Sequence, residues 1–546
     1  MAWSVKKRVA VACAVGWSLT ILGACLIPLL EWVIKKQVEK TVVIKEGGPV
    51  YEFWLDPPVP IYLQVYMFNL TNPDEVLAGT KPPNLVQAGP YTYSEKRTKY
   101  DIKFNDNGTV TYRQNRTFHF LPDMSQGHNE SDIFVTANPV YWALYNALVL
   151  EEPVVREVIY LLTQVFDEHP FMTRPLREII WGYHDQLLNI TKAIDPDWFY
   201  TDYIGFFMNK NATNDGVYTV YTGESDISKL GVIDKYNGSS HLDFWTTTQA
   251  NMINGSDGTL GPPYLPKDTT TYSFSSDVCR SVPGVYSKDV KSPQGIKLWR
   301  FSGPMSAFQN ATENPANLGY CTPQTNCLGG GLVNVSACQS VDFFHLPVAV
   351  SLPHFLFTDK RYLEAVTGLS PNEEEHNTIL DLEPYTGLVL RAEKRVQINV
   401  YLTPIANVTE TLDIKPVFLP IFWLNESAVI DDKSAAKLKR LLFTPLLIIE
   451  VGEITLICVG VLILLGTVIY GIRKNMWDRE SQTYSSGETD ESTNVEYDTQ
   501  PILPGNSGGN TEGSGPHDNL GATGGSGGHD NGEQDRGQTN VGDTQP

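Results

Sequence analysis

Two short matches in this sequence could place a serine for nucleophilic chemistry. Residues 505–509 and 524–528 both read Gly-x-Ser-x-Gly, the pattern that presents a serine on a tight turn between a strand and a helix. Both matches lie in a glycine-rich stretch without apolar periodicity, where neither element is expected. We therefore attribute them to chance and predict no catalytic residue.

Histidines and acidic residues could also bind a metal. The eight histidines from His119 to His376 show no His-Glu-x-x-His or other metal-ligand spacing. Glu373, Glu374 and Glu375 follow Pro371 and are expected in a solvated loop. No glycine-rich phosphate loop precedes an expected helix. The sequence thus predicts no metal, no cofactor and no enzyme.

Seven cysteines fall into two groups. Cys13, Cys25 and Cys458 lie in or near two long apolar runs, and four more lie between the runs, at Cys279, Cys321, Cys327 and Cys338. Four cysteines allow three disulfide pairings, and their spacing alone does not choose one. A zinc site is the rival interpretation, but paired Cys-x-x-Cys units are absent. An oxidising compartment favours two disulfides.

The first apolar run, residues 9–30, carries no charge. A helix of this length rises about 33 Å, enough to cross a hydrocarbon core of about 30 Å. A cleaved signal peptide is the alternative. The run is long for that, and Trp32, Lys35 and Lys36 follow it in place of small residues. We predict an uncleaved membrane helix.

The second apolar run spans residues 446–471, with Glu450 and Glu453 in its outer part. These carboxylates fit the membrane interface, or one of them faces a partner helix. Basic residues at positions 6–8 and 473–474 favour the cytosolic side. We therefore expect cytosolic segments at 1–8 and 472–546, and a lumenal or extracellular domain at 31–445.

Glycosylation sequons agree with this topology. Asn-x-Ser/Thr sequences with x other than proline occur only between the two runs, and twelve on one side of the membrane predict a heavily glycosylated surface. They are Asn69, Asn107, Asn115, Asn129, Asn189, Asn211, Asn237, Asn254, Asn310, Asn334, Asn407 and Asn425.

Composition narrows the class of partner. The chain has 546 residues, with 41 Lys and Arg against 62 Asp and Glu, for a net charge of −21. This acidity argues against nucleic-acid binding, which needs clustered basic residues. Much of the negative charge falls in the segment between the membrane helices, which agrees with an acidic lysosomal lumen.

The last segment is expected to be disordered, because glycine, asparagine and serine cannot bury enough apolar surface to offset ordering entropy. Within it, Asp498, Ile502 and Leu503 have the acidic-x-x-x-Ile-Leu form. This form resembles an acidic dileucine sorting signal, which clathrin adaptors read. We predict such an adaptor as a cytosolic partner.

The lumenal segment mixes strands with a helical insert, which predicts an α+β fold dominated by antiparallel strands. Residues 61–68, 109–112, 217–222 and 396–402 have strand-like composition. Residues 141–190 instead show helical periodicity, with one helix at about 153–168 and a second near 176–187. These apolar stripes either pack on the sheet or form a contact surface for a partner. The candidate partner-binding residues are Val154, Val155, Val158, Ile159, Leu162, Val165 and Phe166.

Several stretches together make the chain resemble the CD36 family of scavenger receptors, and within it the lysosomal branch. The resemblance covers residue 1 to about 474. The matching stretches are residues 65–72, 89–91, 211–216, 251–258, 276–281, 353–355, 394–399 and 424–427.

The resemblance implies a lumenal β-barrel-like core, an apical helical bundle and an apolar tunnel that carries lipids (sterol, phospholipid or fatty acid) to the bilayer. It implies disulfides Cys279–Cys338 and Cys321–Cys327. It also implies a lysosomal or late endosomal membrane as the location. A plasma-membrane scavenger or lipoprotein receptor is the alternative.

The lysosomal branch also sorts a lumenal hydrolase, β-glucocerebrosidase, through its helical bundle, and releases it at acid pH. A histidine in the first bundle helix could act as the sensor, but here that helix has none; His169 follows it and His184 lies in the second. The sorting signal also departs from the pattern, because 43 residues follow Leu503.

Overall fold

The computed structural model describes residues 4–57, 59–148, 153–194, 201–323, 325, 327–336, 338 and 346–487. The chain divides into two units, Met1–Tyr470 and Gly471–Pro546. The fold described below belongs to the first unit, and the sorting-signal residues Asp498, Ile502 and Leu503 lie outside the described residues.

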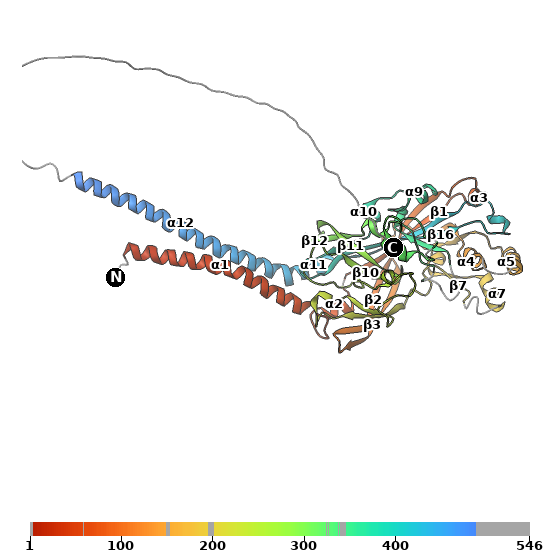
Figure 1. Ribbon diagram of the computed structural model, residues 1–546, viewed down its shortest axis with the longest axis horizontal. Coiled ribbons are helices and arrows are strands. Elements are labelled where there is room, and N and C mark those ends of the chain that lie inside the picture. The colour runs from red at the N-terminus through yellow and green to blue at the C-terminus, as the bar shows by residue number, and fades with distance from the viewer. Residues whose placement is uncertain are drawn as a thin grey trace, which may run out of the picture. The chain divides into compact units, whose positions relative to one another are not determined.

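A thirteen-stranded antiparallel sheet forms the centre of the first unit (Figure 1). In spatial order its strands are β10 (Thr271–Ser275), β11 (Arg280–Lys291), β12 (Lys297–Ser302), β15 (Ile379–Leu382), β16 (Val389–Leu402), β17 (Val417–Val429), β1 (Ile61–Leu70), β2 (Leu85–Asn105), β3 (Thr109–Phe120), β8 (Thr213–Tyr221) and β9 (Ile233–Tyr236); β14 (Val348–Ser351) branches from β16 and pairs with β13 (Val333–Asn334). Two small ribbons, β4 (Ile133–Ala137) with β5 (Phe171–Pro175) and β6 (Tyr183–His184) with β7 (Tyr203–Ile204), stand apart.

The sheet is not closed by a strand pair. Among the described residues its edge strands are β10 and β9, and no ladder joins them. Ser256 forms single-residue bridges both to Val232, next to β9, and to Ser273 in β10. In place of the barrel-like closure that the resemblance implies, the two edges are linked only by these bridges from Ser256, which lies in the long connection between β9 and β10.

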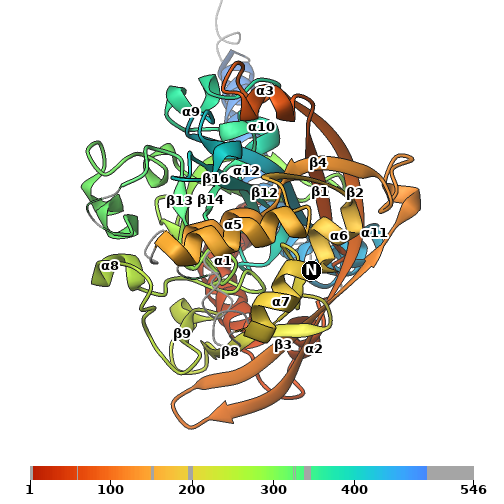
Figure 2. The same cartoon turned by 90° about the vertical axis from the view of Figure 1, so that its right-hand side faces the viewer.

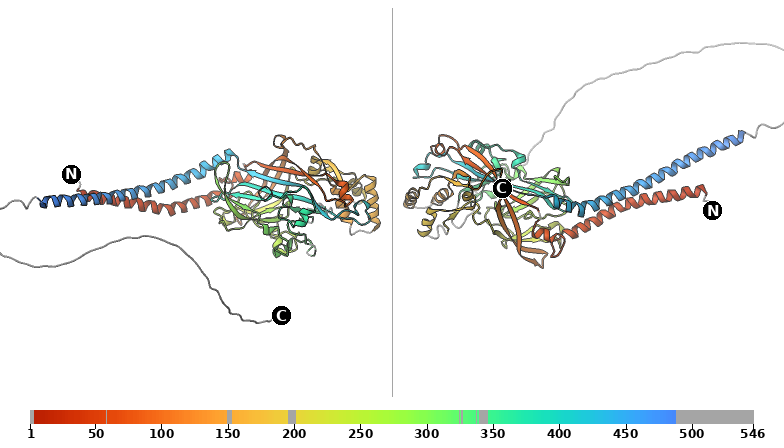
Figure 3. Two further views of the ribbon diagram at one scale, coloured as in Figure 1. Left: turned by 90° about the horizontal axis from the view of Figure 1, so that it is seen from above. Right: turned by 180° about the vertical axis from the view of Figure 1, so that it is seen from behind.

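Helices surround the sheet and flank it at both chain ends. Their bounds are α1 (Val5–Val42), α2 (Tyr51–Leu55), α3 (Pro73–Leu77), α4 (Pro139–Leu148), α5 (Pro153–Val165), α6 (Leu176–Trp181), α7 (Gln186–Ile194), α8 (Thr248–Asn251), α9 (Lys360–Glu364), α10 (Glu373–His376), α11 (Asp432–Leu438) and α12 (Thr444–Gly487). Figure 2 shows α5, α6 and α7 together in front of the strands, and Figure 3 shows the same group from above and from behind.

The helical insert differs in detail from the expectation. The first helix, α5, begins at Pro153 as predicted, where a proline costs no hydrogen bond. The prediction of one second helix near residues 176–187 is wrong. The chain there forms two helices, α6 and α7, separated at Gly182, whose φ of 117° only glycine adopts readily. A Cβ at Gly182 would also lie 2.5 Å from the ring of Tyr203.

Both terminal apolar runs are helices long and apolar enough to cross a membrane, Val5–Val42 and Thr444–Arg479. They pack on each other through glycines: a Cβ at Gly23 would lie 2.6 Å from Ile457, and a Cβ at Gly460 would lie 2.4 Å from Thr20. The thiol of Cys13 donates to Thr467 Oγ1 at 3.2 Å. Small residues thus permit close approach of the two backbones.

The first helix continues past its expected end at residue 30. Its last turns bury Val38 and Val42 in an apolar cluster with Trp54, Tyr112 and Val220 of the folded domain. Because Ile61 of β1 pairs with Ala428 of β17, both membrane helices connect to the same end of the sheet. This end is called the membrane-proximal end below.

Candidate functional site

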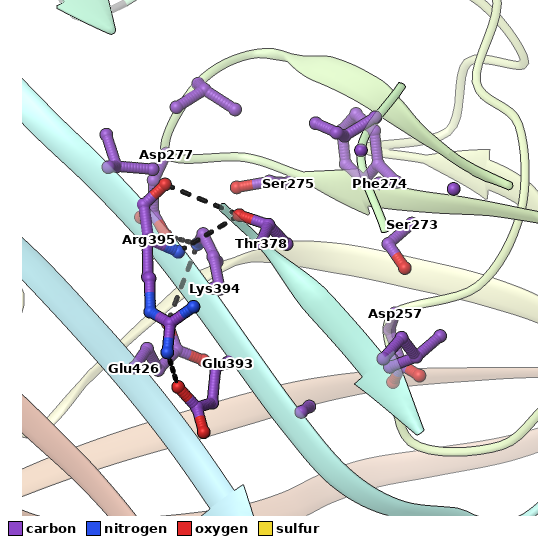
Figure 4. Close-up of a pocket in the computed structure, with 18 of the residues that line it drawn as sticks. Asp257, Ser273, Phe274, Ser275, Asp277, Thr378, Glu393, Lys394, Arg395 and Glu426 are labelled. Carbon is purple, nitrogen blue, oxygen red and sulfur yellow. Dashed lines mark hydrogen bonds and ion pairs between the residues drawn. The ribbon is translucent and has the colours of Figure 1, made fainter. Parts of the chain in front are cut away.

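A cavity of about 290 Å³ lies inside the sheet at the membrane-proximal end. We call it the proximal chamber. Pro57, Ile61 and Ala428 line it near the points where the chain leaves the sheet for the membrane helices. Figure 4 shows Asp277, Lys394 and Glu426 gathered on one side of it and Asp257 on the other.

A second cavity of about 200 Å³, the distal chamber, lies farther along the same strands. Pro139 and Leu188, from α4 and α7, line it, so it lies beneath the helical insert. Its remaining wall is largely apolar and includes Leu63, Phe118, Ile204, Phe206, Phe207, Leu346, Ile398 and Leu424.

The two chambers share part of their walls. On β3, Tyr112 lines the proximal chamber and Phe118 the distal one, with Arg116 lining both. In the same way, Lys394 of β16 and Glu426 of β17 line both chambers. The full shared set is Arg116, Asp277, Val278, Val350, Lys394, Val396 and Glu426. The chambers therefore adjoin within the sheet.

Charged side chains ring the boundary between the chambers. We define the charged collar as Glu95, Arg97, Arg116, Asp277, Lys394 and Glu426. Lys394 Nζ lies 2.6 Å from Asp277 and 3.5 Å from Glu426. Arg97 Nε donates to Glu95 at 2.7 Å, and its terminal nitrogen bonds Glu426. Arg116 lies 3.4 Å from Asp277 and 3.6 Å from Asp215.

Burial and opposite charge act against each other on the collar carboxyls. Burial raises the pKa of Glu95 above its usual range, although Arg97 opposes this. For Glu426 burial also acts upward, but Arg97 and Lys394 outweigh it and lower the pKa to about 2. Burial likewise opposes ionisation of Asp277, yet Lys394 and Arg116 hold its pKa well below the usual range. Glu426 and Asp277 thus stay charged at any lysosomal pH.

Another buried cation, Lys99, lies beside Asp257 and Thr259, two residues that line the proximal chamber. Lys99 Nζ donates to Thr259 at 3.2 Å and lies 3.8 Å from Asp257. It also lies 5.3 Å from the ring centre of Trp54 and 5.2 Å from that of Tyr112. Burial lowers the pKa of Lys99 to about 8, against the attraction of Asp257.

The part of the chain that the structure describes contains no cluster of three histidine, cysteine or acidic residues that could hold a metal ion. Two of the histidines, His354 and His376, stack with ring centres 4.3 Å apart. Each ring accepts a backbone N–H at Nδ1, from Ser370 and Asn372 respectively. These contacts fit neutral rings in a packed core.

The four cysteines between the two apolar helices form two disulfides, Cys279–Cys338 and Cys321–Cys327, the pairs that the resemblance implies. Cys13, Cys25 and Cys458 are free thiols in the membrane helices.

The sequon asparagines differ in exposure. Asn107, Asn129, Asn189, Asn211, Asn237 and Asn407 are exposed, and Asn69, Asn115, Asn254, Asn310 and Asn334 are half-buried. Asn425 is buried in β17, and its amide donates to Gln64 at 3.1 Å. Occupancy of the sequons stays a prediction.

The candidate partner-binding helix divides between surface and core. Val154, Val158 and Val165 are 72%, 49% and 74% exposed, and Leu161 between them is 56% exposed. Leu162 and Phe166 pack against the main core. The side chains of Val155 and Ile159 lie outside the described residues. An apolar stripe of four residues thus faces outward from α5.

The collar was missed in the sequence analysis. Its residues sit on strands where alternation of charged and apolar side chains normally marks a solvent-facing side. One sequence feature could have pointed to the collar. Residues 394–399 and 424–427 are among the family-like stretches, and each places a charged residue inside a strand.

Comparison with known proteins gives a consistent result. A model of the CD36 family matches residues 14–471. Lysosome membrane protein 2 of Homo sapiens is 38% identical over 439 residues, which cover 80% of this chain and 88% of that protein. Scavenger receptor class B member 1 of Rattus norvegicus is 36% identical over 455 residues, which cover 83% and 87%. These relatives carry the names of receptors and membrane proteins, not of enzymes.

Proposed function

The chain belongs to the CD36 family, and from that premise we propose that it is a membrane receptor that binds lipids and passes them through its lumenal domain to the bilayer. The observation that carries this proposal is the pair of adjoining chambers, one beneath the helical insert and one at the membrane-proximal end. The walls of both chambers are largely apolar and the chambers adjoin along the direction that transfer requires, which supports the proposal.

Such a route has a clear physical benefit. Moving a hydrocarbon chain through water costs about 0.8 kcal/mol per CH₂ group, so a sixteen-carbon chain costs about 12 kcal/mol. Apolar walls that line most of the path remove most of that barrier. No covalent step is needed, which fits a receptor.

We place the protein in the lysosomal or late endosomal membrane with both termini in the cytosol. The basic flanks of the two membrane helices, the sequons between them and the acidic dileucine-like Asp498, Ile502 and Leu503 support this location. A clathrin adaptor is the proposed cytosolic partner. The alternative is a plasma-membrane receptor, as in the relatives named scavenger receptors.

Mass spectrometry of lipids extracted from the purified, glycosylated full-length protein tests lipid binding. We expect stoichiometric sterol, phospholipid or fatty acid. Val396→Trp, which fills the boundary between the chambers, should reduce lipid transfer from donor vesicles, whereas the exposed Val86→Trp should not. A protein that is empty and transfers nothing would contradict the proposal.

Location is tested separately by changing Ile502 and Leu503 to alanine. We expect the double variant to accumulate at the cell surface. Unchanged surface and lysosomal levels would instead favour the plasma-membrane alternative or a different sorting signal.

A second function is favoured by the apolar stripe on α5, residues Val154, Val158, Leu161 and Val165. We propose that this stripe captures a lumenal hydrolase of the β-glucocerebrosidase type. Val158→Asp with Leu161→Asp should abolish capture at neutral pH, because each change puts a charge into an apolar interface. The matched control is Val86→Asp, on β2. Undiminished capture by the α5 variant would contradict this role.

A further inference from the structure

One buried arginine of the folded domain has no acidic partner among the residues that the structure describes. Arg280, the first residue of β11, is 7% exposed. Its guanidinium forms no ion pair or hydrogen bond with any described residue, and its Nε is buried without an acceptor. A buried charge is costly unless a counter-charge lies beside it. The surroundings of Arg280 therefore favour an added anion.

The acids that share a cavity with this arginine are already paired. Arg280 lines the proximal chamber, and each acid in the described part of that wall forms an ion pair with another cation. None of these pairs includes Arg280. The acids are Asp215, Asp257, Asp277, Glu393 and Glu426.

Arg280 also lines a separate small pocket of about 40 Å³. We call it the disulfide pocket, because Cys321 of the Cys321–Cys327 disulfide forms part of its wall. Among the described residues that line it, Arg280 is the only charged one. Asp359 lies behind a glycine of this wall, but it is paired with Arg361 at 3.6 Å. The pocket thus has a positive wall and no acid of its own.

Two neighbours of Arg280 in the disulfide pocket suit a bound anion. The hydroxyl of Thr322 is buried, and it has no hydrogen-bond partner among the described residues. The ring of Tyr320 covers one face of the guanidinium, whose carbon lies 3.9 Å from the ring centre. Tyr320 is fixed in turn by Trp245, which meets it edge to face at 5.1 Å. Aromatic packing therefore holds the cation in place and leaves its N–H groups for a ligand.

The size of the disulfide pocket limits that ligand. By the same measure of volume one water needs about 10–15 Å³, so the pocket of about 40 Å³ holds about three water-sized atoms. A hydrocarbon chain does not fit, and neither does sulfate or phosphate with its four oxygens. A monatomic halide does fit.

We propose that the disulfide pocket is a chloride site, in which the guanidinium of Arg280 and the hydroxyl of Thr322 donate to the ion. The same guanidinium lines the proximal chamber, so the ion also neutralises a charge on the wall of the lipid route. This second role rests on the proposed lipid-binding function, whereas the site itself does not.

The first test is the melting temperature of the full-length protein in detergent. Chloride replaces gluconate at constant ionic strength, so that screening stays equal. At chloride about a hundredfold above its dissociation constant, the melting temperature of the wild type should rise by about 3 °C. Bromide should act as chloride does. A melting temperature that does not respond to either halide would overturn the site.

Three variants assign the response to the pocket. Arg280→Met should lose the chloride-dependent rise, and Thr322→Val should weaken chloride binding about tenfold, because one donor is lost. Arg177→Met is the matched control, since it makes the same substitution at an exposed position of α6, and it should keep the full rise. An equal rise in Arg280→Met and in the wild type would show a general salt effect and would overturn the site.

A direct measurement locates the ion even if Arg280→Met fails to fold. Crystals of the wild type soaked in bromide should give an anomalous-scattering peak between Arg280 and Thr322, and the absence of this peak would overturn the site. Neither experiment depends on lipid. Failure of the chloride site would therefore leave the proposed function intact, and a protein without lipid would leave the chloride site intact.

Discussion

We predict that the stacked histidines make the stability of the folded domain depend on pH. His354 and His376 are 5% and 4% exposed. Burial lowers the pKa of each to about 4, from 6.5, with the neighbouring His376 adding to the effect on His354 and Arg395 to that on His376. The unfolded chain therefore binds protons between pH 6.5 and 4 that the folded protein does not. Folding stability then falls as the pH falls through this window, and it is unaffected above it.

The size of the effect follows from the two pKa values. At pH 5 a ring that titrates near 4 when folded and at 6.5 when unfolded costs about 2 kcal/mol of stability relative to pH 7. For a domain of roughly 400 residues, about 1 kcal/mol shifts the melting temperature by about 1 °C. Each ring should therefore lower it by about 2 °C between pH 7 and pH 5.

The perturbation is His376→Asn, measured by thermal unfolding of the full-length protein in detergent at pH 7, 6 and 5. The variant should lose packing at every pH, yet its melting temperature should fall about 2 °C less between pH 7 and pH 5 than that of the wild type. The exposed His119→Gln should not alter the slope. A slope in His376→Asn equal to that of the wild type, or histidine exchange kinetics that report pKa values near 6.5, would refute the reasoning.

Three more outcomes follow from the structure. Asn425 should remain unglycosylated in glycopeptide mass spectrometry while Asn189 is occupied, because Asn425 is buried and its amide is bonded; a glycan on folded Asn425 would mean that β17 is not packed as described. Thr467→Cys should form an intramolecular disulfide with Cys13 under mild oxidation, given the 3.2 Å contact between these side chains. Gly23→Leu should separate the membrane helices and reduce that cross-link by several-fold, since its side chain would collide with Ile457; an undiminished yield would argue against the close packing.

Local sequence patterns predicted most of the framework. Strand-like residues 61–68 lie in β1 and 396–402 in β16, and the proline-started helix is α5. These elements are specified by neighbours in the sequence, through alternation, capping and turn residues. The end of α1 was not predictable in this way, because Val38 and Val42 are helical through packing against Trp54 and not through their own pattern.

The charged collar shows what alternation within a strand cannot predict. Alternation in β2 and β16 shows that the two faces of a strand differ, but it does not say which face is inside. Glu95 and Lys394 read as surface residues, and only the pairing of β1 with β17, two strands far apart in the chain, brings them to a common interior.

The continuous first helix has a mechanical consequence. Because its last turns form part of the folded core, α1 acts as a rigid lever and not as a flexible tether. The second attachment, of α12 to the domain, runs through α11 and β17, and β17 is the neighbour of β1 in the sheet. Rotation of the domain about the bilayer normal would therefore have to twist both helices together. The domain can rock, with Pro28 as the point within α1 where an amide hydrogen is missing and bending costs least. The proximal chamber would therefore keep one orientation relative to the two apolar helices.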